Sequence, residues 1–182
     1  VKVPFIARHP GRIPAGVVCD SLVSAYDFMP TLLDYLGLKP LDMAKRPGVS
    51  FVPALLGQGF ERPGGIVVMD EYGPNRMLRD QRYKYIARYP YGPNALYDLK
   101  ADPGEQDNLL AHGGFEALEQ ELRGRLEKWF AKYVNPEIDG AREAVFGSGQ
   151  IGLAGLWGAG VSAHSCDDYI KKNPNYALYR VK

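Results

Sequence analysis

The chain has 182 residues, of which 46% are hydrophobic and 24% are charged, so it can bury an apolar core and does not have the composition of a disordered chain. Its 22 Lys and Arg nearly balance its 21 Asp and Glu, which leaves a formal net charge of +1 and no field that would attract nucleic acid or an anionic membrane. No apolar run reaches the roughly 18 residues of a membrane span. From the charge and the apolar runs together, we expect neither nucleic acid nor a membrane as a partner.

The first segment, residues 3–8, is an apolar run that predicts a short buried strand, closed by the turn His9-Pro10-Gly11. A buried strand needs neighbouring strands, and neither an initiating Met nor a turn precedes Val1. We therefore interpret the start as a cut end within a larger sheet. This interpretation leaves the compartment undetermined, with the cytoplasm and the periplasm or cell exterior both open.

A helix is predicted to begin at Ser24 or Asp27, which are good N-cap residues, and to run to about Leu36. Pro30 falls within the first turn, where proline is tolerated, and Gly37 is placed to end the helix. The predicted apolar stripe of this helix consists of Tyr26, Met29, Leu32, Leu33 and Leu36. The Pro- and Gly-rich stretch 38–65 is expected to be a connector outside the core, with one short helical candidate at 50–56.

From Ile66 the apolar pattern changes to a period of two, which predicts strands at residues 66–72, 76–79, 82–89 and 96–99. The pair Asp80-Gln81 favours a tight hairpin between the second and third of these strands. Together the strands predict a small antiparallel sheet.

A long amphipathic helix is predicted to cover one face of that sheet. Its apolar residues are Phe115, Leu118, Leu122, Leu126, Trp129, Phe130 and Tyr133. Gly124 weakens this helix without ending it. After Val134 the sequence becomes rich in glycine, and we expect this extension to pack over the rest of the chain.

Two segments carry motifs that occur together in one protein family. Residues 1–38 contain a run that ends in a Pro-Gly turn, followed by an Asp-x-x-Pro-Thr-Leu-Leu helix and a Gly, supplied by Asp27, Pro30, Thr31, Leu32, Leu33 and Gly37. Residues 76–110 contain a hairpin, a Leu-Tyr-Asp-Leu strand and an Asp-Pro-x-Glu-x-x-Asn-Leu turn, supplied by Arg82, Lys84, Tyr85, 96–99, Asp102, Pro103, Glu105, Asn108 and Leu109. In this order and at about this spacing, the segments resemble the C-terminal portion of sulfatases, which are hydrolases of the alkaline-phosphatase superfamily.

The second motif also has a physical account that does not need the family. Asp102 can cap its own turn, Pro103 presets the backbone, and Asn108 can satisfy free amides where the chain turns toward the long helix. We therefore expect these residues to be structural.

The resemblance implies an α+β fold, the C-terminal part of an alkaline-phosphatase-like α/β sulfatase, with a small four-stranded antiparallel sheet packed on a long C-terminal helix. Residues 1–64 would be the end of the large α/β catalytic domain, with its last strand and helix. Residues 65–135 would be the small C-terminal α+β subdomain. Residues 136–182 would be a Gly-rich extension that packs across both.

The resemblance also implies that the intact enzyme hydrolyses sulfate esters or sulfamates. Sulfatases use a formylglycine made from a Cys or Ser within Cys-x-Pro-x-Arg, and a calcium ion held in part by an Asp-Asp pair. Cys19 and Cys166 do not fit that motif, and Asp167-Asp168 lies far from the family's position, so a solvated turn is the better interpretation. We expect no catalytic residue and no metal ligand in this chain, with calcium belonging to the intact enzyme and the isolated chain inactive.

Five residues are candidates for contact with the substrate. His9 lies at the end of the predicted strand, where active sites of the superfamily open, although it can also simply cap its turn. Tyr72, Asn75 and Arg76 lie where the small domain is expected to face the cleft, and Arg76 can pair with a sulfate or with a structural carboxylate. Gln150 lies in a glycine-rich run that can carry it to a pocket.

Two alternatives remain open at this stage. The chain can be the same portion of a phosphodiesterase or phosphonate hydrolase of the superfamily, in which a Thr or unmodified Ser replaces the formylglycine. It can also be a non-catalytic module that binds glycan or protein through its sheet and aromatic residues. The expected partners are a sulfated small molecule or glycan, bound through the intact enzyme, and the missing N-terminal part of the same protein, while homo-oligomer formation is left open.

Overall fold

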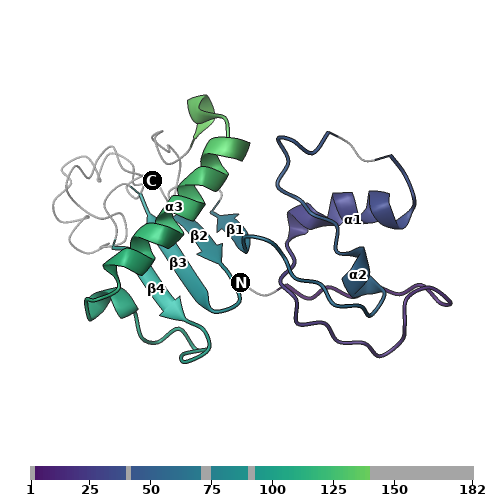
Figure 1. Ribbon diagram of the computed structural model, residues 1–182, viewed down its shortest axis with the longest axis horizontal. Coiled ribbons are helices and arrows are strands. Elements are labelled where there is room, and N and C mark those ends of the chain that lie inside the picture. Colours follow the sequence, from purple (N-terminus) through teal and green to yellow (C-terminus); the bar gives the residue numbers. More distant parts are fainter. Residues whose placement is uncertain (1–2, 40–41, 71–74, 90–92, 140–182) are drawn as a thin grey trace, which may run out of the picture. The chain divides into compact units, whose positions relative to one another are not determined.

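The structure is a computed structural model that describes residues 3–39, 42–70, 75–89 and 93–139. The chain forms two compact units, Val1–Ile66 and Val67–Lys182, and each is described here by itself (Figure 1). Among the described residues, no helix combines the length and the apolar character that crossing a membrane requires.

The first unit is built around one short helix and the loops that surround it. A single 3-10 turn, η1 (Ala25–Asp27), leads directly into α1 (Phe28–Tyr35), and a further short helix, α2 (Val52–Leu55), follows the loop. The helix predicted from Ser24 or Asp27 to about Leu36 is confirmed. Gly37 follows it with φ +66°, a left-handed backbone that glycine adopts without strain and that ends helices.

The strand predicted at residues 3–8 is wrong, because this segment is irregular and mostly exposed in the structure. Val3 and Ile6 are 80% and 89% exposed. A strand gains its backbone hydrogen bonds only from a neighbouring strand, and the described residues of the first unit contain none. Phe5 is nevertheless held in place, because its ring packs edge-on against the ring of Phe51, with 5.5 Å between centroids.

The connector predicted at residues 38–65 belongs to the core at one point, contrary to expectation. Phe51, just before α2, is only 3% exposed, and Ala54 is also buried. The backbone N–H of Phe51 donates to Oγ1 of Thr31 at 3.0 Å, which pulls this loop onto α1. The helical candidate at 50–56 is confirmed as α2.

The second unit contains a four-stranded sheet, in which the strands lie side by side in chain order. Strand β2 pairs antiparallel with β3, and β3 pairs antiparallel with β4. The bounds of the strands are β1 (Ile66–Met69), β2 (Asn75–Arg79), β3 (Tyr83–Arg88) and β4 (Ala95–Asp98). All four predicted strands are confirmed in position, although residues 71 and 72, expected to extend the first one, lie outside the described residues.

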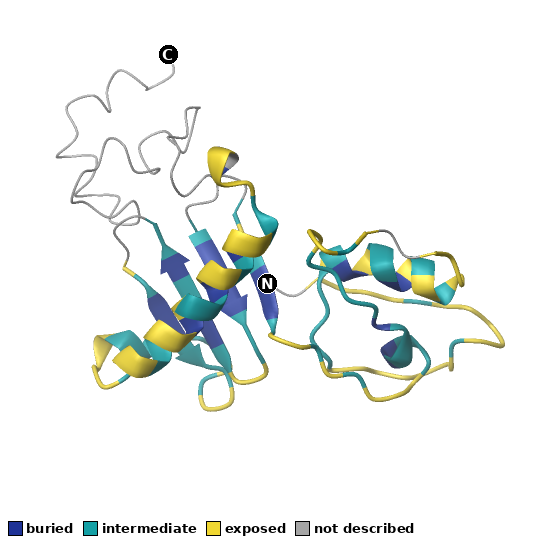
Figure 2. Cartoon of the chain, turned by 45° about the horizontal axis from the view of Figure 1, so that its top comes forward, coloured by how far each residue is buried: buried dark blue, intermediate teal, exposed yellow. Residues whose placement is uncertain are grey.

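The long predicted helix is confirmed as α3 (Glu116–Tyr133), which crosses one face of the sheet (Figure 1). The strand register aligns Leu78, Tyr85 and Leu96 across β2, β3 and β4 on that face. They belong to one buried cluster with the inner side of the helix, which consists of Val67, Leu78, Tyr85, Ala87, Leu96, Leu122, Leu126 and Phe130. Figure 2 shows this burial as dark strands beneath a helix whose outer side is exposed.

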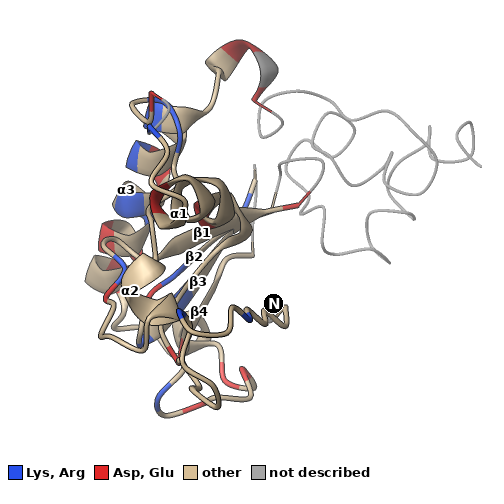
Figure 3. Ribbon diagram, turned by 90° about the vertical axis from the view of Figure 1, so that its right-hand side faces the viewer, with Lys and Arg blue, Asp and Glu red and all other residues tan. Residues whose placement is uncertain are grey.

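The outer side of α3 carries charges of both signs (Figure 3). Arg123 Nε donates to Glu127 Oε1 at 2.9 Å, one helical turn away. A polar link also joins the sheet to the helix, because the Tyr85 hydroxyl donates to Glu119 Oε1 at 3.2 Å. Burial and the nearby Glu119 carboxylate raise the pKa of Tyr85 above its ordinary value, so this hydroxyl stays protonated and keeps donating.

The hairpin between β2 and β3 is closed by Asp80, as the sequence predicted. Its N–H donates to the Tyr83 carbonyl at 3.0 Å, and its Oδ1 accepts from the N–H groups of Arg82 and Tyr83 at 3.0 and 2.8 Å. Oδ2 accepts from Arg125 Nη1 of α3 at 3.0 Å. Burial alone would raise the pKa of Asp80, but these hydrogen bonds and the Arg125 charge outweigh it, so that pKa lies below its ordinary value of 3.8.

A carboxyl group whose pKa falls on folding stabilises the fold above its ordinary pKa, and this contribution disappears as the pH drops through the lowered value. We expect the free energy of unfolding to decrease as the pH falls below 3.8, measured by urea unfolding at a series of pH values. In Asp80→Asn this decrease should be smaller, because the titrating group is gone. An equally steep decrease in the variant would show that Asp80 does not contribute.

Candidate functional site

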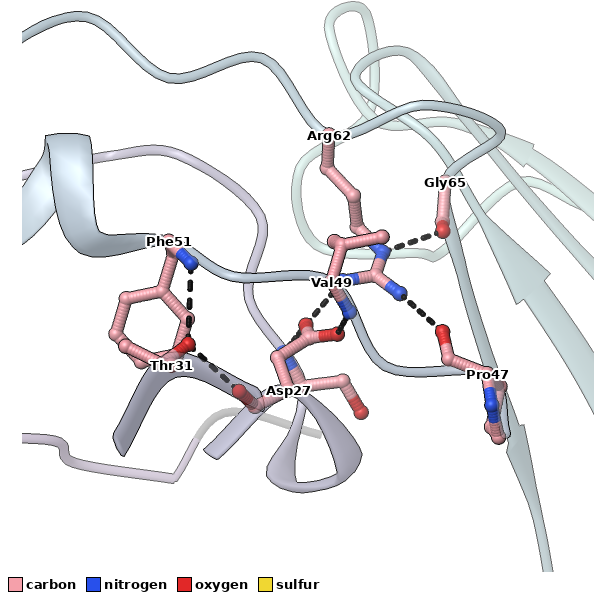
Figure 4. Close-up of polar contacts among 8 residues, drawn as sticks. Asp27, Thr31, Pro47, Val49, Phe51, Arg62 and Gly65 are labelled. Atoms are coloured by element: carbon pink, nitrogen blue, oxygen red, sulfur yellow. Dashed lines mark hydrogen bonds and ion pairs between the residues drawn. The ribbon is translucent and has the colours of Figure 1, made fainter. Parts of the chain in front are cut away.

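The carboxylate of Asp27 is the polar centre of the first unit (Figure 4). The residue is fully buried, with 0% exposure. Its Oδ1 accepts from the N–H of Val49 at 2.9 Å, and its Oδ2 accepts from the N–H of Ser24 at 2.8 Å. One carboxylate therefore joins the segment before α1 to the loop that returns from it.

Arg62 neutralises this buried charge and extends the network to the end of the unit. Its Nη1 pairs with Asp27 Oδ2, and its Nε donates to the carbonyl of Gly65 at 2.8 Å. The guanidinium also lies over the ring of Tyr26, with 5.0 Å from Cζ to the ring centre. Both charged side chains are nearly inaccessible, at 4% for Arg62 and 0% for Asp27, so the pair is structural and does not face a ligand.

Thr31 and Gly48 complete the closure of this network. The Thr31 hydroxyl donates to the Asp27 carbonyl at 2.6 Å and accepts from the N–H of Phe51. A Cβ on Gly48 would lie 2.2 Å from the carbonyl oxygen of Tyr26, so only glycine lets the loop approach this closely. The motif residues Asp27 and Thr31 thus serve to fold the loop 47–51 against α1.

Replacing Asp27 by Asn should destabilise the first unit by about 3–5 kcal/mol, because Arg62 would keep a buried charge without its counterion. The amide group would also present a donor to the N–H of Ser24. Hydrogen exchange of the Ser24 and Val49 amides measures the effect, with Asp34→Asn as the control. Asp34 is an exposed carboxylate of α1 that accepts from the Ser50 hydroxyl, so its loss should change stability by only about 0.5 kcal/mol. Equal effects of the two substitutions would contradict the assigned role of Asp27.

The motif residues of the second unit bind one another in the same way. Lys84 Nζ of β3 donates to Glu105 Oε2 at 2.5 Å, and Arg82 Nε donates to Asp98 Oδ2 at 2.9 Å. Glu105 has φ 56°, and among the described residues it is the one non-glycine with positive φ. The ion pair with Lys84 holds the turn in this unfavourable backbone conformation.

Asn108 fastens that turn to the sheet. Its Oδ1 accepts from the N–H of Leu96 at 2.9 Å and of Leu110 at 3.3 Å, and its Nδ2 donates to the Asn94 carbonyl at 3.2 Å. Asp102 Oδ2 accepts from the N–H of Asp107 at 2.8 Å. The structural roles predicted for Asp102 and Asn108 are therefore confirmed.

Asn108→Ala should lower the free energy of unfolding by about 1–3 kcal/mol, because the buried N–H of Leu96 would lose its acceptor. Asn135→Ala provides the matched control, since Asn135 is exposed and caps only the short turn η3 (Pro136–Ile138) through Glu137 N. Thermal unfolding followed by circular dichroism compares the two. If the control lost as much stability as Asn108→Ala, the anchoring role of Asn108 would be wrong.

The structure separates the five residues predicted to contact substrate. Tyr72 and Gln150 lie outside the described residues. His9 belongs to the first unit and is exposed, with Nδ1 2.7 Å from the Tyr35 hydroxyl oxygen. Asn75 begins β2, and its Nδ2 donates to Asp70 Oδ2 at 2.5 Å. Their contact with a substrate stays a prediction.

Arg76 is the most enclosed of the three candidates that the structure describes. It is 5% exposed and forms an ion pair with Asp139, which follows η3. Its guanidinium carbon lies 3.7 Å from the centre of the Phe130 ring and 4.9 Å from that of Tyr89. In this arrangement the Arg76 side chain joins the end of α3 to the sheet. This geometry fits the alternative that Arg76 pairs with a structural carboxylate.

The described residues do not fit a calcium site. Nowhere in that part of the chain do three or more His, Cys, Asp or Glu gather as ligands for a metal ion. Cys19 is an exposed free thiol, whereas Cys166 and the pair Asp167-Asp168 lie outside the described residues.

Sequence reasoning missed two residues beside His9. Arg12 lies over the Tyr35 ring, with Cζ 4.9 Å from its centre, and Tyr35 is the residue that contacts His9. The turn 9–13 and the end of α1 are distant in the sequence, so no spacing pattern connects them. Only the folded chain shows that they form one exposed group.

Comparison with known proteins gives a consistent result. Residues 1–132 match the family described as the C-terminal region of N-sulphoglucosamine sulphohydrolase. An ulvan-active sulfatase of Formosa agariphila is 31% identical over 166 residues, which cover 71% of this chain and 33% of that protein. A Δ4,5-hexuronate-2-O-sulfatase of Bacteroides thetaiotaomicron is 32% identical over 140 residues, covering 72% of this chain and 29% of that protein.

A similar fold occurs in a crystal structure of a candidate sulfatase from Bacteroides thetaiotaomicron. The TM-score is 0.50 at 28% identity, over 66% of this chain and 29% of that chain. This likeness, with the small sheet packed on α3, confirms the fold class expected from the sequence. The chain spans about a third of the length of the curated relatives it matches.

Proposed function

Because this chain belongs to the sulfatase family and corresponds to the C-terminal portion of a sulfatase, we propose that it serves in the hydrolysis of sulfate esters or sulfamates by an intact sulfatase. Its own contribution is to shape and support the substrate pocket. The formylglycine nucleophile and the calcium ligands belong to a part of the enzyme that these residues do not include. The relatives named as sulfatases of ulvan and of hexuronate support a sulfated saccharide as the substrate.

The observation that supports this proposal is that side chains of the family motifs bind other residues of the same chain. Asp27 pairs with Arg62 and accepts from two backbone amides, and Lys84 pairs with Glu105. Cleavage of a sulfate ester needs a nucleophile, a cation that holds the sulfate oxygens, and an acid for the leaving alcohol. The motif side chains that are paired in this way perform none of these steps, so support is the role that remains for them.

We further propose that residues 1–64 are the end of the large catalytic domain, residues 65–135 the small subdomain, and residues 136–182 an extension across both. An exposed apolar surface on the first unit supports this division. Phe28 and Leu32 of α1 and Leu36, which directly follows it, are spaced by four residues and are 51%, 43% and 55% exposed. Soluble proteins rarely leave such a stripe uncovered, so the stripe is a surface for the remainder of the catalytic domain.

The same stripe should make the isolated chain associate with itself. Leu32→Lys places a charge in the stripe and should shift the purified chain toward the monomer in sedimentation velocity. Met69→Lys is the matched control, because Met69 is 49% exposed but belongs to the second unit. A wild-type chain that is already monomeric at high concentration, or an equal shift in the control, would count against the stripe as a docking surface.

The reaction itself is tested by the coding sequence upstream of Val1 and by the protein that it encodes. We expect a Cys or Ser within Cys-x-Pro-x-Arg or a close variant, and a preceding Asp-Asp pair, together with sulfate-ester hydrolysis by the complete protein. A Thr or unmodified Ser at the nucleophile position, with cleavage of phosphate or phosphonate esters, would favour the phosphorus alternative. A complete protein that binds glycan without cleaving it would favour the non-catalytic module.

A further inference from the structure

Three side chains of the first unit meet at an exposed point where the turn 9–13 lies against the end of α1. The Tyr35 hydroxyl oxygen lies 2.7 Å from His9 Nδ1, and the two rings pack edge-on with 5.8 Å between centroids. The Arg12 guanidinium carbon lies 4.9 Å from the centre of the same tyrosine ring. The three residues form the His9–Arg12–Tyr35 cluster.

The backbone fixes the spacing within the cluster. The carbonyl of His9 accepts from the N–H groups of Arg12 and Ile13 at 3.1 and 2.9 Å, which closes the turn. Gly11 supplies the left-handed backbone of that turn, with φ +81°. His9 and Arg12 are therefore held on the same side of a closed turn before any ligand arrives, which lowers the entropic cost of binding one.

The cluster leaves hydrogen-bonding groups available to a ligand. His9 uses Nδ1 for the Tyr35 hydroxyl, so Nε2 is the ring nitrogen that remains. Within the described part of the chain, neither Nε2 nor the Arg12 guanidinium has a hydrogen-bond or ion-pair partner. Other arginines are committed to carboxylates, as in the pairs Arg62–Asp27, Arg76–Asp139 and Arg82–Asp98.

The charge around the cluster favours an anion. Arg8, which precedes His9 in the sequence, is exposed, so Arg8 and Arg12 bring two positive charges to this segment. The acidic neighbour of Tyr35 on α1, Asp34, brings one negative charge and accepts from the Ser50 hydroxyl at 2.5 Å. A guanidinium stacked on an aromatic ring keeps its N–H groups in its own plane, where they bind two oxygens of one oxyanion side by side. An imidazole N–H beside it supplies a further donor.

We propose that His9 and Arg12 bind an oxyanion of the saccharide, either its sulfate group or a carboxylate, and that Tyr35 is a positioning residue that orients the His9 ring. The saccharide as the source of the anion rests on the proposed function. The anion site itself rests on the geometry of the cluster.

Titration of the purified chain tests the site directly. The imidazole signals of His9 are followed by NMR while sodium sulfate, or separately sodium glucuronate, is added against sodium chloride at equal ionic strength, which removes general screening. Saturable shifts with sulfate assign the site to the sulfate group, and saturation with glucuronate alone assigns it to a carboxylate. Shifts no larger than those with chloride would overturn the proposal.

Variants separate this site from a general surface effect. Arg12→Gln should weaken binding by about ten-fold, which is the usual loss for a charge-assisted hydrogen bond. Arg46→Gln is the matched control, because Arg46 is also an exposed arginine of the first unit but lies outside the cluster. Equal weakening in both variants would overturn the proposal.

Tyr35→Phe tests the positioning role, because it keeps the ring beneath Arg12 and removes only the hydroxyl. The expected result is a change in the ¹⁵N shifts of His9 Nδ1 and Nε2, which report the tautomer, together with weaker binding. Unchanged nitrogen shifts and unchanged affinity would show that Tyr35 does not position His9. The amide spectrum of each variant checks that it is folded.

The complete sulfatase distinguishes this inference from the proposed function. If it cleaves sulfate esters and Arg12→Gln leaves KM and kcat unchanged, the substrate-binding role of the cluster is wrong and the proposed function stands. If it cleaves none, although the chain binds sulfate through Arg12, the proposed function fails and the anion site stands.

Discussion

The first unit depends on one buried carboxylate. Asp27 accepts hydrogen bonds from the backbone of Ser24 and Val49 and pairs with Arg62, so a single side chain joins three segments. A buried ion pair is costly to desolvate, and removing one partner leaves the other charge buried without a counterion. The turn 9–13 rests against the end of α1, and α1 is held at its start by this network. The position of Tyr35 in the His9–Arg12–Tyr35 cluster therefore depends on the network that Asp27 forms at the start of α1.

The second unit obtains its order mainly from an apolar layer between the sheet and α3, to which polar side chains add specific contacts. Asp80 closes the hairpin between β2 and β3, and Asn108 joins the turn after β4 to the strand itself. The positive φ of Glu105 is held by Lys84. The residues that give the second family motif its character are thus bound mainly to one another. These contacts give the motif residues of the second unit a structural role.

The sequence was sufficient where structure is local. The period of two from Ile66 and the helical spacing from Phe115 predicted the strands and α3, because each pattern needs only one face to be buried. The strand expected at residues 3–8 fails for the opposite reason, since its hydrogen bonds must come from strands that the described residues of its unit do not contain. Burial of Phe51 was missed because it follows from a hydrogen bond to Thr31 across the loop. The same limit hid Arg12 and Tyr35, which are brought beside His9 only by the fold.

We propose that this chain supports the fold and contacts the substrate, and that other parts of the intact enzyme cleave the sulfate ester. The most direct measurement is the hydrolysis of an aryl sulfate by the purified chain in the presence of calcium, with circular dichroism confirming that it is folded. The account predicts no turnover above that of a heat-inactivated sample. Turnover by the folded chain alone would mean that its own residues supply a nucleophile, and the division of roles proposed for it would be wrong.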